Sequence, residues 1–191
     1  GGNIGMTMIE PSDKVGAHVE ATGGSDYMAR GFVRMNSGLL STGTKFYVSV
    51  SETRADKWRG EGDISRQHID FNLKQQVQDQ SSISASVQYN YAENYSYRAV
   101  TKNQWQTSGR YFDWDNTYDP NNPANYYKFR RNPFNNAIAQ ITGRFQINDN
   151  LRLSVQPYFW YGYGLGSSQV VLSETKFLNK ATGTTTARRA A

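Results

Sequence analysis

The chain has 191 residues, a length that suits one ordinary domain, and its 21 basic and 16 acidic residues give a net charge of +5. It contains no cysteine, which excludes a disulfide framework and a thiolate metal site. Aromatic residues reach 14% and charged residues only 19%, and no apolar run approaches the length of a membrane-spanning helix.

Most of the chain is predicted to form β-strands, because apolar and polar residues alternate with a period of two. In SISASVQYNY (82–91), for example, the odd-numbered residues are apolar or aromatic and the even-numbered ones are Ser, Gln or Asn. No helix is expected, since apolar residues do not recur at helical spacing over any useful length. Pro157 argues against a central position for the last strand. The pattern predicts seven strands, at residues 15–21, 29–35, 45–51, 68–74, 82–91, 139–147 and 151–165.

The connections between these strands alternate between short and long. We expect short turns at 36–43, 79–80 and 148–149 and long loops at 53–64, 99–133 and 166–191, with the short turn at 23–26 as the exception. Short turns at one end and long loops at the other are typical of outer-membrane barrels, whose long loops are extracellular. A strand of about 10 residues, rising ~3.3 Å each and tilted ~45°, spans ~23 Å, close to the apolar band of such barrels. The predicted fold class is therefore all-β, an antiparallel transmembrane β-barrel.

The two faces of the predicted strands differ in a way that favours lipid on one side and water on the other. Aromatic residues close the apolar face near the long-loop end in two strands, as in a membrane girdle. A soluble β-sandwich or lipocalin-like barrel is the alternative, in which the apolar face would be a core. In a membrane barrel the opposite face would line a lumen and contact a plug, and its charged residues are Arg30, Arg34, Asp70, Lys74, Arg144 and Arg152.

The loop at 99–133 concentrates aromatic and basic side chains. Rings and guanidinium groups together can hold a flat, anionic ligand by stacking and charge. The alternative is that these side chains pack the loop on its neighbours and bind lipopolysaccharide phosphates. The candidate ligand-binding residues are Trp105, Tyr111, Trp114, Tyr126, Tyr127, Arg130 and Arg131.

The same loop contains DWDNTYD, which brings Asp113, Asp115 and Asp119 together as a weak candidate for a calcium site. The spacing lacks the glycine and the glutamate of an EF-hand, so solvated turn carboxylates are the favoured interpretation. No other metal site, no cofactor and no catalytic residue is expected. The basic residues form no continuous stripe, so nucleic acid is not expected as a partner.

Several segments, taken in order, resemble the TonB-dependent outer-membrane receptors. GGNIGMTMIEP (1–11) is similar to the end of the plug domain, where Gly1, Gly2, Ile4 and Pro11 match the layout of that region. VGAHVEATGGSDYMARGFVRMNSGLL (15–40) and KFYVSVSETRADKW (45–58) resemble the first barrel strands. FRRNPFNN (129–136) and LRLSVQPYFWYGYG (151–164) resemble the ferric-siderophore members in particular.

The resemblance implies a receptor in the outer membrane of a Gram-negative bacterium that imports a ferric siderophore or a similar scarce nutrient. TonB would supply the energy and no bond would be made or broken, so an enzyme is not expected. The implied partners are the nutrient, TonB through an N-terminal part that is missing here, and outer-membrane lipid and lipopolysaccharide. TonB-linked transporters of this kind form barrels of about 22 strands, so we expect a fragment. Residues 1–13 would be the end of the plug and a linker, and residues 14–191 the first part of the barrel wall.

Two alternatives from other classes stay open. The first is a passive porin or a small closed outer-membrane barrel, in which residues 167–177 would supply an eighth strand. The second is a soluble β-domain that binds a small molecule. The sequence does not identify the ligand, because residues outside this chain would share the site.

Overall fold

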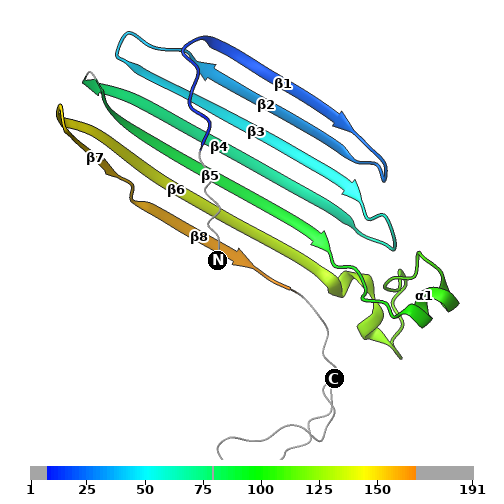
Figure 1. Ribbon diagram of the computed structural model, residues 1–191. Coiled ribbons are helices and arrows are strands. Elements are labelled where there is room, and N and C mark those ends of the chain that lie inside the picture. The colour runs from blue at the N-terminus through cyan, green and yellow to red at the C-terminus, as the bar shows by residue number, and fades with distance from the viewer. Residues whose placement is uncertain (1–7, 79, 167–191) are drawn as a thin grey trace, which may run out of the picture.

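The computed structural model describes residues 8–78 and 80–166, which form one antiparallel sheet (Figure 1). The first six strands lie in chain order, and β7 and β8 both pair with β6. The all-β, antiparallel part of the prediction is thus confirmed. The strands are β1 (Val15–Gly23), β2 (Ala29–Ser37), β3 (Thr44–Asp56), β4 (Asp63–Gln78), β5 (Ser81–Tyr95), β6 (Arg131–Asn148), β7 (Leu151–Val155) and β8 (Tyr158–Gly164).

The last predicted strand, 151–165, is divided into β7 and β8 at Gln156 and Pro157, so the count of seven strands was wrong by one. Proline has no N–H to donate to a ladder, and the regular pairing stops there. The carbonyl of Pro157 still accepts a hydrogen bond from the Ile141 amide (3.1 Å), and β8 resumes along the same neighbour. The sheet therefore has eight strands in seven positions, with Pro157 at an edge of the described sheet.

Strands β3 to β6 all extend further toward the long-loop end than predicted. β4 begins at Asp63 and β6 at Arg131, where the apolar alternation has already ended. Their polar residues nevertheless continue the ladder, and at the start of β6 the Arg131 guanidinium makes two hydrogen bonds of 2.6 Å to Glu93 on β5. The loops at this end are accordingly residues 57–62 and 96–130 rather than 53–64 and 99–133. Of the third expected loop, 166–191, all but the first residue lies outside the described residues, as does the eighth strand considered at 167–177.

The expectation of no helix was also wrong, because α1 (Lys102–Ser108) forms within the longer loop. It is held by a capping box, in which the Thr101 hydroxyl accepts from the Gln104 amide and the Gln104 side chain accepts from the Thr101 amide. Seven residues make only about two turns, too few to show a helical period in the sequence. Two short 3-10 turns follow, at Pro123–Asn125 and Tyr127–Arg130. None of the helices among the described residues is long and apolar enough to cross a membrane.

The strand register puts the predicted apolar residues on one face of the sheet. Residues directly opposite each other in an antiparallel pair share a face. One row across all seven positions consists of Val19, Val33, Val50, Ile69, Tyr89, Ala137 and Tyr161. The neighbouring row on the other face consists of His18, Arg34, Ser49, Asp70, Gln88, Ile138 and Trp160. We call the two sides the apolar face and the polar face.

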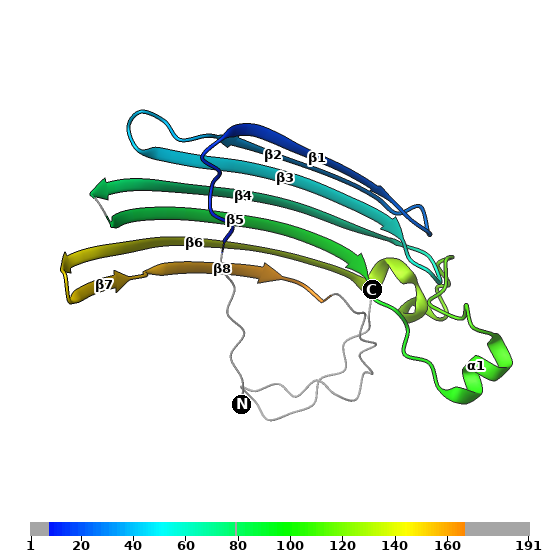
Figure 2. The same cartoon turned by 45° about the horizontal axis from the view of Figure 1, so that its top comes forward.

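The apolar face has no second layer over it in the part of the chain that the structure describes. Val19 is 70% exposed and Tyr161 is 49% exposed. Among the described residues the only buried large hydrophobic residue is Tyr47, which lies on the polar face. Figure 2 shows the same single curved layer, with the turns β2–β3, β4–β5 and β6–β7 at one end and α1 at the other. Since β1 pairs only with β2, and β7 and β8 only with β6, the described sheet is not closed.

Candidate ligand-binding loops and the polar face

The two loops at the α1 end are joined by a buried ion pair. The Lys57 ammonium lies 2.9 Å from the Asp113 carboxylate, and their side chains are 0% and 1% exposed. The other carboxylate oxygen of Asp113 accepts hydrogen bonds from the backbone amides of Arg98 (2.7 Å) and Trp114 (2.9 Å). A buried charge is stable only when it is paired and hydrogen-bonded, so this contact fixes residues 57–62 against 96–130.

Gly60 is the residue that lets the shorter loop approach Asp113. Its backbone has φ +66°, which residues with a side chain rarely adopt, and a Cβ placed there would lie 2.5 Å from the Asp113 Cβ. The alternation in the sequence gave no sign of this contact. Gly60, one of two glycines in the KWRGEG segment (57–62), is its only trace, and a loop glycine alone does not identify its neighbour.

Trp114 and Arg130, two of the predicted ligand residues, are half-buried and pack against each other in the longer loop. The Arg130 guanidinium lies 3.9 Å from the centre of the Trp114 ring, and the Arg98 guanidinium lies 5.1 Å from it. The indole N–H donates to the carbonyl of Ser96 (3.0 Å), and Arg130 donates to that of Ala124 (2.7 Å). These two side chains therefore pack within the loop, which was the alternative to ligand binding in the sequence-based prediction.

Tyr126 and Tyr127 also pack within the loop. Tyr126 contacts Tyr118, Tyr127 and Phe129 at ring distances of 5.3–5.7 Å, and Tyr127 contacts Tyr95 at the end of β5. A hydrogen bond with the Tyr126 hydroxyl raises the pKa of the neighbouring Lys128. Arg131 lies opposite Tyr95 at the start of β6 and is paired with Glu93.

The predicted residues that remain open to a ligand are Trp105 and Tyr111, which are 56% and 63% exposed. Trp105 lies on α1 and lines a pocket of about 360 Å³ between the two loops. We call this the two-loop pocket; its lining consists of Trp58, Arg59, Val100, Trp105, Gly109 and Arg110. Trp58 and Arg59 were not predicted, because the candidates were sought in the longer loop alone, and Arg110 of that loop was not among the candidate residues.

The three aspartates of DWDNTYD are not gathered into a metal site. Asp113 is held by Lys57, whereas Asp119 accepts a hydrogen bond from the Asn121 amide (2.8 Å) in an exposed turn. Asp115 is tied through its backbone, donating to Asn125 and accepting from Tyr127. Among the described residues no group of three potential metal ligands lies close enough to hold an ion.

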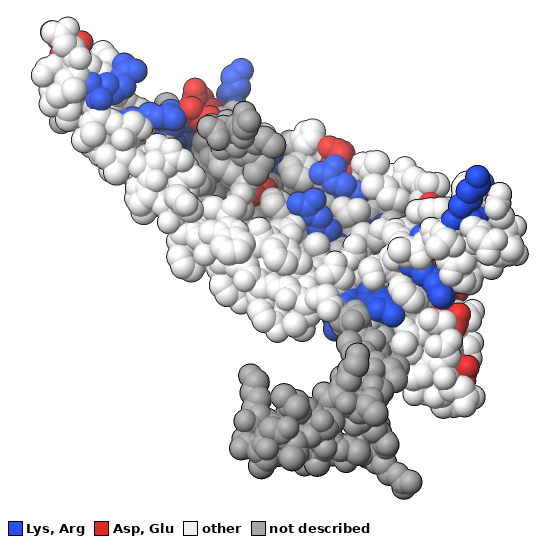
Figure 3. Space-filling view, turned by 60° about the horizontal axis from the view of Figure 1, so that its bottom comes forward, with Lys and Arg blue, Asp and Glu red and all other residues white. Residues whose placement is uncertain are grey.

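The strand register places the six predicted charged residues on one face, the polar face. Arg30, Arg34 and Asp70 lie opposite polar-face residues of neighbouring strands, as do Lys74, Arg144 and Arg152. Their local partners include Glu20 for Arg30 (2.7 Å), His68 for Asp70 (2.9 Å) and the Tyr47 ring for Arg34 (5.0 Å). Figure 3 shows lysine and arginine side chains spread along the sheet and around the α1 end, with fewer acidic ones between them. That this face lines a lumen stays a prediction.

The N-terminal segment that the structure describes, residues 8–13, crosses the polar face. The Asn72 amide donates to the carbonyl of Ile9 (3.0 Å), and the Glu10 carboxylate lies 2.7 Å from Lys45 and 2.9 Å from Lys74. Hydrogen bonds from Lys45 and then Lys74 hold the pKa of Glu10 below its ordinary value. A groove of about 130 Å³ remains between this segment and β4, β5 and β6.

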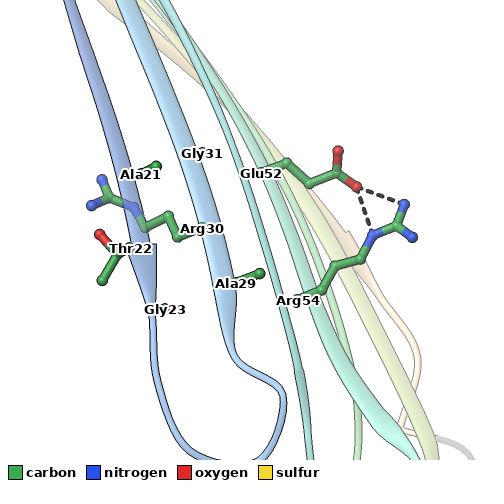
Figure 4. A pocket seen from close by; sticks show the side chains of 8 residues that line it. All are labelled: Ala21, Thr22, Gly23, Ala29, Arg30, Gly31, Glu52 and Arg54. Carbon is green, nitrogen blue, oxygen red and sulfur yellow. Dashed lines mark hydrogen bonds and ion pairs between the residues drawn. The ribbon is translucent and has the colours of Figure 1, made fainter.

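A hollow of about 590 Å³ lies at the long-loop end of β1, β2 and β3. Ala21, Gly23, Ala29 and Gly31 leave it open, and Figure 4 shows Glu52 and Arg54 paired beside it while Arg30 points to the other side. None of the predicted ligand residues contributes to it. At this end of the sheet the apolar face carries a charged pair, Glu52–Arg54 (2.7 Å).

In comparisons with models of protein families, with curated proteins and with solved structures, no match to this chain was found. A proposal about the family or the function of this chain therefore rests on the residues and the geometry described above.

Proposed function

We propose that this chain is part of the wall of an outer-membrane receptor that imports a ferric siderophore or a similar scarce nutrient with energy from TonB. The observation that supports it most is the apolar row that crosses all seven strand positions on one uncovered face. A soluble protein rarely exposes a contiguous apolar patch beyond a few hundred Å². Lipid would cover this face along its whole width.

The opposite face has the properties that a plugged lumen requires. It is polar, it carries both signs of charge, and residues 8–13 cross it through Asn72, Lys45 and Lys74. In the proposed receptor this segment is the linker between plug and barrel, which enters the wall at β1. An open sheet edge in hydrocarbon leaves backbone groups unpaired, so further strands of the whole protein would continue the sheet at β1 and β8.

The loops at the α1 end are well suited to capture an anionic chelate outside the cell. Residues 57–62 and 96–130 together contain seven basic and four acidic residues, and nine of the residues in 96–130 are aromatic. The Lys57–Asp113 pair and the packed rings hold them in one arrangement, which limits the ordering cost of binding.

The test is to produce the whole protein that carries this chain in a Gram-negative host and to follow it and its substrate. We expect heat-modifiable migration from the outer-membrane fraction. We also expect uptake of radioactive iron as a siderophore complex in cells that contain TonB and none in cells that lack it. Single-channel conductance with uptake independent of TonB would favour the passive porin instead. A protein that is monomeric in buffer without detergent would favour the soluble β-domain.

A further inference from the structure

The two-loop pocket joins residues from two segments that are 41 to 52 positions apart in the chain. Trp58 and Arg59 come from the β3–β4 loop, and Trp105, Gly109 and Arg110 come from α1 and the residues just after it. Its volume of about 360 Å³ lies at the lower end of the range typical of small-molecule sites. It is therefore large enough for one ring with a small substituent.

One arginine of the pocket is held in place before any ligand binds. The Arg59 side chain is 12% exposed, and it donates to the carbonyl of Arg98 (2.6 Å). Its guanidinium also stacks on the Trp58 ring at 5.2 Å. A guanidinium fixed in this way loses little further freedom when it pairs with an anion.

The charge around the pocket is positive and is not cancelled locally. Arg59 lies 3.8 Å from Asp113, but that carboxylate is already paired with Lys57 at 2.9 Å. Arg110 contacts the Tyr111 ring at 5.0 Å, and no acidic residue lines the pocket. Two arginines beside two exposed indoles favour a ligand with both a ring and a negative charge.

We propose that the two-loop pocket binds a small, flat aromatic anion, such as an aromatic carboxylate or the part of an iron chelate that contains one. This inference rests on the proposed function in one respect only. In the proposed receptor, the imported chelate would insert an aromatic arm into the two-loop pocket. Arg59 and Arg110 supply the charge complement, and Trp58 and Trp105 supply the rings. The binding itself requires neither TonB nor transport.

The experiment is isothermal titration calorimetry on the whole protein purified in detergent, with salicylate as the probe. Cyclohexanecarboxylate keeps the charge without the aromatic ring, and phenol keeps the ring without the charge at neutral pH. Salicylate should bind, and the other two should bind at least tenfold more weakly. Raising the salt concentration should weaken salicylate binding, because the arginine contribution is screened.

Trp105→Ala and Arg110→Gln should each weaken salicylate binding roughly tenfold, the scale of one partly desolvated cation–ring or stacking contact. Tyr27→Ala, at an exposed turn, and Lys102→Gln, on α1 outside the pocket lining, are the matched controls and should bind salicylate within twofold of the unaltered protein. Both altered pocket residues are exposed, so heat-modifiable migration should be unchanged and any lost binding is local.

Unchanged salicylate affinity in both pocket variants would overturn the inference, as would equal binding of all three probes. If iron uptake still depends on TonB in that case, the proposed function stands and only the pocket is refuted. If salicylate binds as expected but no TonB-dependent uptake is found, the pocket stands and the proposed function fails.

Discussion

Replacing Val87 by arginine should destabilise the folded protein in a membrane by about 2–4 kcal/mol, the cost of a cation on a lipid face at mid-membrane. Val87 lies on the apolar face of β5, between Phe71 of β4 and Ala139 of β6, and is 47% exposed. β5 has 15 residues, so at ~3.3 Å each and a ~45° tilt it rises ~35 Å. Val87 is one residue from its midpoint, within ~3 Å of the membrane centre on this geometry.

The next residue on the same strand provides the matched control. Gln88 points to the polar face, opposite Asp70 of β4, and its amide contacts the Met8 sulfur. A Gln88→Arg side chain would have a carboxylate across the ladder and water beside it, so we expect a cost below about 1 kcal/mol. Both free energies come from urea titrations of the whole protein in lipid vesicles.

The cost of an arginine at different depths in the membrane distinguishes a face that contacts lipid from a face that another protein layer covers. Tyr163→Arg, at the long-loop end of the apolar face on β8, should cost only about 0–1 kcal/mol if lipid is the neighbour, because the penalty falls toward the interface. Equal costs at Val87 and Gln88 would refute the assignment of the faces. A large cost at Tyr163 that matches the cost at Val87 would refute lipid as the covering layer.

Three further predictions concern the loops, the N-terminal segment and the isolated chain. Asp113→Asn leaves the buried Lys57 without its carboxylate, which should lower the free energy of unfolding by about 3–5 kcal/mol and speed amide hydrogen exchange in both loops. Asp119→Asn, in an exposed turn, should have neither effect. Equal exchange rates in the two variants would contradict this prediction. Because the pKa of Glu10 is held below its ordinary value of 4.5, its contribution to docking is complete above that pH and is lost as the pH falls through the lowered value. A spin label at Ile9→Cys should therefore become mobile on acidification, and mobility that does not depend on pH would count against the contact. Residues 1–191 alone should not refold in detergent to a stable monomer, since the described sheet has open edges at β1 and β8; a heat-modifiable monomer with cooperative unfolding would favour the small closed barrel.

The sheet could be predicted from the sequence because alternation is a local property. A strand turns each successive side chain to the opposite face, so SISASVQYNY identifies its own apolar side without any neighbour. The register then aligns these sides, because a slip of one residue would turn a whole strand over. The ends of β4 and β6 were missed for the converse reason, since polar residues pair by backbone hydrogen bonds that leave no periodic pattern.

The sequence by itself thus determined most of the strands, their two faces and the richness of the long loop in rings and arginines. Only the tertiary structure decided what each loop side chain does. Asp113 is an ion-pair partner rather than a metal ligand because Lys57, 56 positions away, pairs with it, and Gly60, which has no Cβ, packs closely against it. Trp114 contacts Arg98 and Arg130, and Trp105 is left exposed beside Trp58 and Arg59. Such contacts depend on where two separate loops meet in space, and no spacing along one of them contains that information.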